Sequence, residues 1–491
     1  MNDIEQYEEK AKSANVIPVV DTLSADLLTP LAVYLKLSAG VESSFLFESV
    51  EGGETLARYS FIGAEPFMTV TGNDHEVTIT DLNGQRTVAK PLFEFLREYF
   101  SRYKVYEDSS LPSFIGGAVG SLNFSCCSWF EPSLVTKVQR GDDLGTFMFF
   151  GSIVAFDHAK QTISIVSLIF TEDIADGEIG SAVRSARARN AEIKRILEHD
   201  ELRIERPLGE KPAAAMTSNW KREDFELAVT EIKELINAGE AYQVVLSQCF
   251  SVPTNASPVA IYRAVRRSNP SPYMFLIRTG GRSIIGASPE MLVRVRGRSL
   301  EYRPIAGTRP RGHSPEDDES LAEEMRADRK EVAEHLMLVD LGRNDLGRVA
   351  EYASVKVDSL MHVEKYSHVQ HLVSYLSAKL REGLDRFDAL ACCFPAGTVS
   401  GAPKVRAIEI IDRLEPTPRG VYAGTVGYID YAGNLDTCIA IRAMSHENGL
   451  ATVQAGAGIV ADSVPASEFE ETVNKAKAMI NAIAIAEESE Q

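Results

Sequence analysis

Two pairs of glutamates have a spacing that suits a metal ion. Glu331 and Glu334 stand three residues apart on one predicted helix, and Glu468 and Glu471 repeat the spacing on another. Residues three apart share a helix face, so two such faces could together present oxygen ligands of the kind that Mg²⁺ prefers. A chain with 70 acidic residues also produces this spacing by chance on solvated faces. The spacing alone therefore leaves both interpretations open.

The residues after Glu334 favour the metal site. His335 and the run LMLVDL (336–341) predict a mostly buried helix segment, which the turn LGRNDLGRVA (341–350) is expected to end. Carboxylates beside such a run are costly to bury unless they are paired or bound to a cation.

Two segments rich in small residues could bind a ligand through their backbone. The loop FPAGTVSGAPKVRAIEII (394–411) runs into an amphipathic helix, and its amides with the hydroxyls of Thr398 and Ser400 suit a carboxylate or phosphate. Its spacing is not that of a P-loop. The segment GAGIVA (456–461) resembles a dinucleotide fingerprint, but no helix opens after it, so we reject that interpretation and keep close approach of a ligand.

Two further side chains have a structural and a functional interpretation. Arg442 lies in the strand-like CIAIRAM (438–444), where a buried arginine meets a carboxylate of the protein or of a ligand. His371 lies in HVQHLVSYL (368–376), which we interpret as an apolar helix. A lone histidine in that setting is more often structural than catalytic.

Composition excludes some partners. The chain of 491 residues has 51 basic and 70 acidic residues, a net charge of −19, and 44% hydrophobic residues, which is typical of a soluble globular protein. The acidic excess argues against nucleic acid and against anionic membranes. Any anionic substrate would need a local cation.

The cysteines and the N-terminus predict a cytoplasmic protein. The six cysteines form no CxxC motif, and none has the glycine-flanked GxCxG pattern of a glutaminase nucleophile. The N-terminus lacks the basic flank and apolar run of a signal peptide, and the charge-free stretch 109–130 is too polar to span a membrane.

Irregularly alternating elements predict an α+β fold. Strands are expected within 43–63, 69–92, 147–170, 242–250, 273–277 and 283–286. Helices are expected at 183–197 (exposed), 222–238, 320–341 and 466–486. The Pro/Ala-rich region 205–218 is the best boundary, dividing the chain into 15–204 and 219–488.

Taken together, several stretches resemble the chorismate-utilising enzymes, and most closely the group that converts chorismate to anthranilate. The resemblance spans most of 220–480 and, more loosely, FLFES (45–49). The matching stretches are AYQVVLSQ (241–248), NPSPYMF (269–275), IIGASPEMLV (284–293), RPIAGTRPRG (303–312), KEVAEHLMLVDLGRNDLGRV (330–349), FPAGTVSGAPK (394–404), PRGVYAGTVGYID (418–430), LDTCIAIR (435–442) and VQAGAGIVADSVPASEFEETVNKA (453–476). The family fold has mixed, largely antiparallel sheets packed as a sandwich with flanking helices.

The resemblance implies a role for each site residue. Glu334 and Glu471 match direct Mg²⁺ ligands, and Glu331 and Glu468 match residues that act through bound water. Glu290 matches the general acid for the departing ring hydroxyl, which needs a raised pKa. His371 matches a histidine of the pyruvate elimination. Contacts to the substrate are implied for Thr398, Tyr422, Arg442, Gly456, Ala457 and Gly458.

Two positions distinguish relatives. Enzymes that add water to chorismate carry a lysine base where this chain has Gln243, and aminodeoxychorismate synthases typically carry lysine where it has Ala306, beside Thr308. Both favour ammonia attacking ring C2, followed by loss of pyruvate to give anthranilate, the first step of tryptophan biosynthesis. Aminodeoxychorismate or isochorismate synthesis, or a catalytically silent regulatory relative, are the alternatives.

The resemblance also implies partners. Without a glutaminase signature, the chain is expected to receive ammonia from a separate glutamine amidotransferase subunit, in a hetero-oligomer. L-Tryptophan is the expected inhibitor, although FLFES and the run SLNFSCCSWFE (121–131) depart from the family pattern. The matching pocket residues are Glu48, Ser49, Pro272, Tyr273, Met274 and Cys438.

Overall fold

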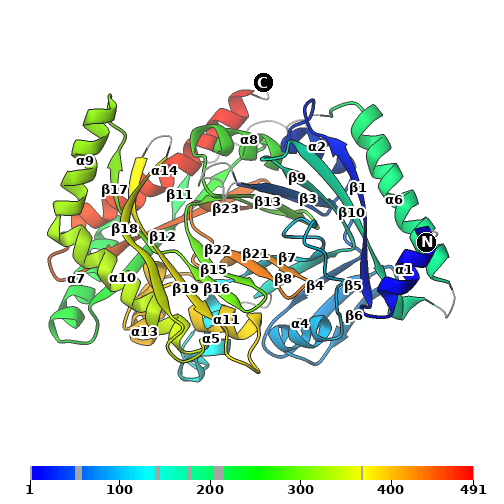
Figure 1. Cartoon of the computed structure of the whole chain (residues 1–491). Coiled ribbons are helices and arrows are strands. Elements are labelled where there is room, and N and C mark those ends of the chain that lie inside the picture. Colours follow the sequence, from blue (N-terminus) through cyan, green and yellow to red (C-terminus); the bar gives the residue numbers. More distant parts are fainter. Residues whose placement is uncertain are drawn as a thin grey trace.

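The structure is a computed structural model that describes residues 3–49, 58–138, 144–174, 178–203, 215–366 and 369–489. Two large sheets with helices around them form its centre, and the chain ends lie on different sides (Figure 1). Every strand pair in the two sheets is antiparallel in the described chain. The predicted α+β class is confirmed.

The first sheet has the strand order β1-β10-β9-β3-β2-β13-β14-β23-β24-β12-β11, and β20 pairs with β12. Its strands are β1 (Val16–Ser24), β2 (Ser44–Glu48), β3 (Tyr59–Ala64), β9 (Ser152–Asp157), β10 (Thr162–Phe170), β11 (Thr217–Ser218), β12 (Gln243–Pro253), β13 (Tyr273–Thr279), β14 (Arg282–Ser288), β20 (Gly401–Ala402), β23 (Ala443–Glu447) and β24 (Leu450–Ile459). The long β12–β24 ladder supplies one wall of the site described below.

The second sheet has the order β17-β19-β16-β15-β22-β21-β7-β8-β4-β5-β6, and β18 pairs with β19. Its strands are β4 (Met68–Gly72), β5 (Val77–Asp81), β6 (Gly84–Val88), β7 (Gly117–Leu122), β8 (Gly145–Phe150), β15 (Met291–Arg296), β16 (Ser299–Tyr302), β17 (Ile305–Pro310), β18 (Lys356–Lys365), β19 (Val369–Lys379), β21 (Thr425–Asp430) and β22 (Leu435–Ile439).

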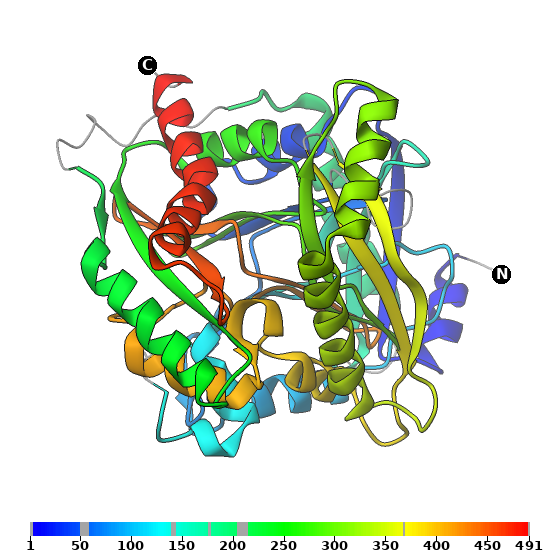
Figure 2. The same ribbon diagram turned by 90° about the vertical axis from the view of Figure 1, so that its left-hand side faces the viewer.

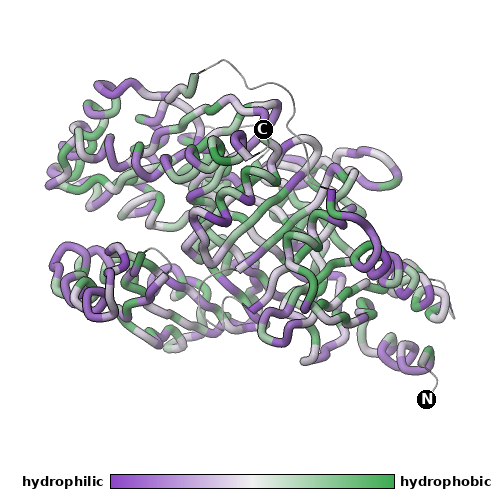
Figure 3. Tube along the Cα trace, turned by 90° about the horizontal axis from the view of Figure 1, so that it is seen from above, coloured by the Kyte–Doolittle hydropathy of each residue, from purple (hydrophilic) through white to green (hydrophobic). Residues whose placement is uncertain are grey.

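Helices cover the outer faces of the sheets, and Figure 3 shows hydrophobic residues concentrated along the central strands. The α-helices are α1 (Asp3–Ala11), α2 (Pro30–Leu37), α4 (Leu92–Ser101), α5 (Cys127–Phe130), α6 (Ile179–His199), α7 (Arg222–Asn237), α8 (Pro258–Ser268), α9 (Pro315–Ala327), α10 (Arg329–Gly347), α11 (Arg386–Cys393), α12 (Gly397–Ser400), α13 (Lys404–Leu414) and α14 (Pro465–Ser489). The 3-10 turns are Phe124–Cys126, Pro132–Leu134 and Thr171–Asp173. Each described helix is too short or too polar to cross a membrane.

Three local predictions about helices are wrong. The single helix expected at 320–341 is two helices, because the Asp328 side chain accepts hydrogen bonds from the amides of Lys330 and Glu331 and caps a new start. The turn expected at 341–350 is still helix up to Gly347, and Leu336 is 41% exposed. The helix at 183–197 is only partly exposed, because Val183 and Leu197 are buried.

The segment around His371 is also different from its prediction. It forms β19, paired with β17, β16 and β18, instead of a helix. Arg442 lies between β22 and β23, with a φ of 47°, and is not inside a strand. Short apolar runs do not by themselves distinguish a helix from a buried strand, and pairing with neighbouring strands decided this one.

Both sheets combine strands from the two predicted parts of the chain. In the first sheet Met274 pairs with Glu48, and in the second Thr425 pairs with Leu122. One buried hydrophobic cluster includes residues from both parts. The proposed division into 15–204 and 219–488 stays a prediction, and residues 204–214, which include most of the boundary region 205–218, lie outside the described residues.

Candidate active site

A cavity of about 340 Å³ collects most of the predicted site residues. Helices α10 and α14 lie on two sides of the view in Figure 2, and residues from both line it. The predicted residues in its wall are Gln243, Glu290, Thr308, Glu334, His371, Thr398, Tyr422, Arg442, Gly456, Gly458, Glu468 and Glu471. Of the predicted site, Glu331 and Ala457 do not line it.

Carboxylates gather at one end of this cavity. Burial raises the pKa of Glu334, and the nearby Glu331 and Glu471 raise it further. Burial likewise raises the pKa of Glu468. Oε1 of Glu471 forms an ion pair with Nζ of Lys475 at 2.6 Å. Oxygen ligands that repel one another in this way fit a divalent cation such as Mg²⁺, which would offset their repulsion.

The carboxylates do not form a finished metal cluster. Among the described residues, no three His, Cys, Asp or Glu side chains converge closely enough to hold an ion. Glu331 turns to Arg309, whose Nη1 lies 3.3 Å from its Oε1. The donor set is suitable in chemistry, and the metal assignments of all four glutamates stay predictions.

Glu290 lies between β14 and β15 with only 6% of its surface exposed. Burial raises the pKa of its carboxyl to about 8, while Thr398 and Arg303 lower it by smaller amounts. The buried Thr398 hydroxyl has no hydrogen-bond partner of standard geometry within the described chain. Glu290 can therefore hold a proton at neutral pH, as a general acid must.

A β-bulge fixes His371. The register between β17 and β19 shifts between Ala306 and Thr308, which places the Gly307 carbonyl 2.9 Å from Nδ1 of His371. The Thr308 hydroxyl lies 3.1 Å from the same nitrogen. Burial lowers the pKa of His371, so the ring is neutral at pH 7.

Glycines of β24 make room for two side chains. A Cβ on Gly458 would lie 2.4 Å from Nε2 of Gln243, and one on Gly456 would lie 2.8 Å from the Tyr422 hydroxyl. Burial raises the pKa of Tyr422 to about 12. Ala457 is fully buried, and its side chain points to the face of the strand opposite Gly456 and Gly458, so only its backbone could serve a ligand.

Arg442 presents a cation to the cavity without a carboxylate of its own. Nη1 of Arg442 donates to the Asn269 side-chain oxygen at 3.3 Å, and no ion pair joins Arg442 to an acidic group of the described residues. Of the two interpretations that the sequence left open, the structure therefore favours a ligand carboxylate.

Sequence reasoning missed several cavity residues. Lys330 and Lys475 line the acidic end, and Nζ of Lys475 donates to the Gly456 carbonyl at 3.1 Å. The i, i+4 spacing of Glu471 and Lys475 could have indicated this ion pair. Gln454 and Met479 gave no comparable signal.

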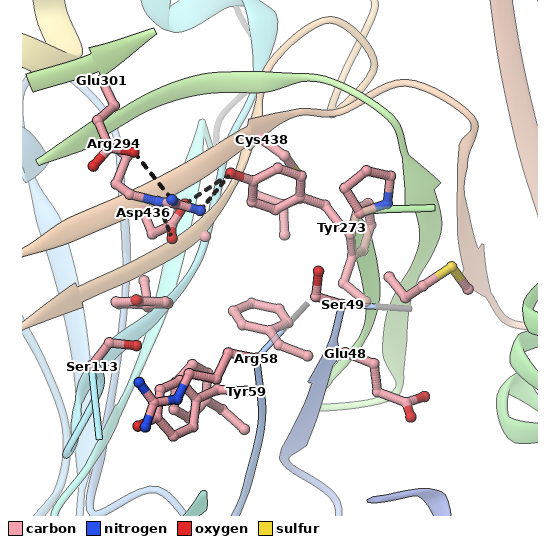
Figure 4. Close-up of a pocket in the computed structure, with 18 of the residues that line it drawn as sticks. Glu48, Ser49, Arg58, Tyr59, Ser113, Tyr273, Arg294, Glu301, Asp436 and Cys438 are labelled. Atoms are coloured by element: carbon pink, nitrogen blue, oxygen red, sulfur yellow. Dashed lines mark hydrogen bonds and ion pairs between the residues drawn. The ribbon is translucent and has the colours of Figure 1, made fainter. Parts of the chain in front are cut away.

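A second cavity, of about 390 Å³, lies between the two sheets (Figure 4). All six residues predicted for the tryptophan pocket line it, from β2, β13 and β22 or, for Ser49 and Pro272, from the residues next to β2 and β13. Its polar end was not predicted. There Asp436 accepts hydrogen bonds from Tyr273 at 3.1 Å and from Arg294 at 2.8 Å.

The Glu48 carboxylate turns away from this second cavity, as Figure 4 shows. It accepts hydrogen bonds from the Tyr262 hydroxyl at 2.5 Å and from Nε of Arg266 at 3.0 Å, both on α8. The Ser49 hydroxyl is buried and has no partner among the described residues, so it remains able to bond a ligand.

Comparison with known proteins identifies the family. The model of the chorismate binding enzyme family matches residues 42–481, and the chain belongs to this family. It is 45% identical to anthranilate synthase component 1 of Pseudomonas aeruginosa, with all of both chains covered. The chain is also 45% identical to anthranilate synthase component 1 of Acetivibrio thermocellus, with 98% of each chain covered.

Solved structures agree. Anthranilate synthase component I of Streptococcus pneumoniae superimposes with a TM-score of 0.74 at 34% identity, covering 93% of this chain and 98% of the other. The menaquinone-specific isochorismate synthase of Escherichia coli gives 0.68 at 20% identity, covering 98% of each chain, and shares the fold alone.

Proposed function

We propose that this chain is the chorismate-binding subunit of an anthranilate synthase, which aminates chorismate at C2 with ammonia and then eliminates pyruvate. The observation that carries the proposal is the cavity itself. It combines a buried carboxyl with a pKa of about 8, a cation without a carboxylate partner in the described chain, and a group of carboxylates. The names of the relatives support the same reaction.

The residues divide the chemistry between them. Arg442 and Tyr422 hold the enolpyruvyl carboxylate, with Thr398 and the backbone of 456–458 as further contacts. Protonated Glu290 gives its proton to the C4 hydroxyl, which leaves as water while the nitrogen bonds to C2. The neutral ring of His371 then accepts the proton of C2 as the C3–O bond breaks and enolpyruvate departs, and a proton added to the methylene carbon of enolpyruvate gives pyruvate.

A divalent cation completes the acidic end. Glu334 and Glu471 would bind Mg²⁺ directly, and Glu331 and Glu468 would act through its waters. When bound, the ion would neutralise the ring carboxylate of chorismate, which a chain of charge −19 otherwise repels.

Gln243 and Ala306 argue against the alternatives. Both line the cavity, where relatives that use water or a lysine nucleophile carry a lysine. Gln243 is neutral and cannot activate water as a base, whereas un-ionised ammonia needs no base to attack. A silent relative would have no need of a buried acid and an unpaired arginine in one cavity.

Two partners follow from the proposal. Ammonia comes from a separate glutamine amidotransferase subunit, because no cysteine has a nucleophile motif, and free ammonium salt should replace it. L-Tryptophan inhibits from the second cavity, whose wall includes all six predicted residues.

All six cysteines are unpaired, which supports the expected cytoplasmic location.

The test is an incubation with chorismate, Mg²⁺ and ammonium salt at mildly alkaline pH, followed by anthranilate fluorescence. Appearance of anthranilate with equimolar pyruvate supports the proposal. Isochorismate or aminodeoxychorismate would favour the other family reactions, and a folded protein without any product would overturn it.

Glu334→Gln tests the metal assignment. We expect turnover to fall by at least about 10²-fold and calorimetric Mg²⁺ affinity to fall with it. Asp340→Asn on the same helix is the control, because Asp340 is 72% exposed and, among the described residues, forms an ion pair only with Arg343. Unchanged metal affinity in Glu334→Gln would remove the assignment.

A further inference from the structure

A buried ion pair stands directly behind the cavity wall. Arg419 and Glu415 have side chains that are 1% and 3% exposed. Nε of Arg419 donates to Oε2 of Glu415 at 2.8 Å, and Nη2 donates to Oε1 at 2.7 Å. This two-pronged geometry is the strong form of an arginine–carboxylate pair.

The remaining N–H groups of Arg419 reach two cavity-lining residues. Nη1 donates to the Val399 carbonyl and Nη2 to the Val245 carbonyl, each at 2.7 Å. Val399 follows Thr398 in α12, and Val245 lies two residues after Gln243 in β12. One guanidinium thus joins the backbone beside two predicted substrate-facing residues.

Glu415 extends the same network. Its Oε1 accepts hydrogen bonds from the Ser247 amide at 2.8 Å and from the Ser247 hydroxyl at 2.7 Å. That hydroxyl also accepts a hydrogen bond from Nε2 of Gln454, a cavity residue of β24. The guanidinium of Arg419 lies over the ring of Tyr422, 5.6 Å from its centroid.

Charge alone cannot explain this arrangement. A lysine would keep the ion pair, but its single ammonium cannot reproduce a planar fork that serves one carboxylate and two carbonyls. The bonds that Arg419 makes beyond the ion pair both end on backbone that lines the cavity. Misplacing a reacting group by about 1 Å can cost on the order of 10²-fold in rate.

We propose that Arg419 is a positioning residue for chorismate amination: it holds α12 against β12 and so sets Thr398, Gln243 and Tyr422 around the substrate. The inference rests on the proposed function and adds to it a residue that does not touch the substrate. Its effect passes through the backbone at Val399 and Val245.

The experiment is a double-mutant cycle between Arg419→Lys and Thr398→Val in the full chain. For Arg419→Lys we expect kcat to fall on the order of 10²-fold, with a smaller change in the KM for chorismate. Because Thr398 lowers the pKa of Glu290, both single variants should move the alkaline limb of the pH profile upward. In the double variant the alkaline limb should move no further, and kcat should fall by less than the product of the two single losses.

Arg386→Lys is the matched control. Arg386 is a buried arginine that lies 3.7 Å from Asp430 and donates to the Asp430 carbonyl, and neither residue lines the cavity. The Arg386→Lys variant should have a lowered melting temperature, as Arg419→Lys does, but its kcat and pH profile should be unchanged.

If Arg419→Lys does not fold, the pair variant Arg419→Met with Glu415→Met replaces it, since apolar substitution of a buried pair is often tolerated. The same loss of kcat and shift of the limb are expected. Additive effects with Thr398→Val, or a profile equal to that of Arg386→Lys, would overturn the positioning role. A wild-type protein that makes no anthranilate would instead overturn the proposed function.

Discussion

Nδ1 of His371 lies 2.9 Å from the carbonyl oxygen of Gly307. A carbonyl only accepts hydrogen bonds, so Nδ1 carries the proton and the other ring nitrogen, Nε2, keeps its lone pair. Since burial lowers the pKa of His371, this neutral form dominates at pH 7. The bulge at Gly307 therefore prepares the ring as a base that faces the cavity.

The first prediction concerns the elimination step. His371→Asn should slow anthranilate formation by about 10²-fold or more, because the base that takes the ring proton is gone. Amination should continue, so chorismate should disappear faster than pyruvate forms in a coupled assay. His446→Asn, at a buried histidine outside the cavity, should keep the two equal. Equal loss of both steps in His371→Asn would contradict the assignment.

The second prediction is the pH dependence of catalysis. Glu290 must be protonated to act, and its pKa is about 8, so kcat/KM should decline above about pH 8 at a fixed concentration of un-ionised ammonia. Glu290→Gln should lose about 10²-fold or more and show no such limb. A limb that persists in the Gln variant would belong to another group.

Glu290 should also affect stability, which is the third prediction. Its pKa is raised in the folded chain, so the folded state binds the proton more tightly than the unfolded chain, where the value is about 4.3. The contribution of protonated Glu290 to the free energy of unfolding is fully present below about pH 4. It is lost as pH rises toward about 8, and the loss is on the order of a few kcal/mol. The melting temperature of Glu290→Gln relative to wild type should therefore rise between pH 5 and pH 9. A constant difference would show that the carboxyl ionises normally.

The fourth prediction concerns Gly458. A Cβ there would lie 2.4 Å from the Gln243 amide, so Gly458→Ala should displace Gln243 and raise the KM for chorismate or lower kcat by about tenfold. Gly347→Ala is the control, because no atom of the described chain outside its own helix lies within 4 Å of the added methyl group. Equal kinetics of the two variants would show that the position of Gln243 does not matter.

The fifth prediction concerns the second cavity. Ser49→Phe should fill part of its 390 Å³ and raise the L-tryptophan concentration for half inhibition by about tenfold or more, with kcat nearly unchanged. The stabilisation of the melting temperature by tryptophan should disappear with it. Undiminished inhibition in this variant would place the inhibitor elsewhere.

Helices with clear periodicity could be predicted closely from the sequence. The helix expected at 222–238 is α7 (Arg222–Asn237), and the one expected at 466–486 lies within α14 (Pro465–Ser489). The error at 320–341 arose because no glycine or proline marks a break there, while the cap that separates α9 from α10 is a side-chain hydrogen bond. The strand around His371 was missed because two of its partners, β16 and β17, are far away in the sequence.

The sequence by itself determined which groups could do chemistry: paired glutamates at helical spacing, an arginine among apolar residues, glycine-rich segments that leave room for a ligand, and no recognisable thiol nucleophile motif. These are local properties, set by residue type and spacing. Only the tertiary structure decided that Glu290 holds its proton, that Arg442 lacks an acidic partner in the described chain, and that the Glu48 carboxylate faces α8. The physical reason is that desolvation and charge pairing depend on elements far apart in the chain, which no local spacing records.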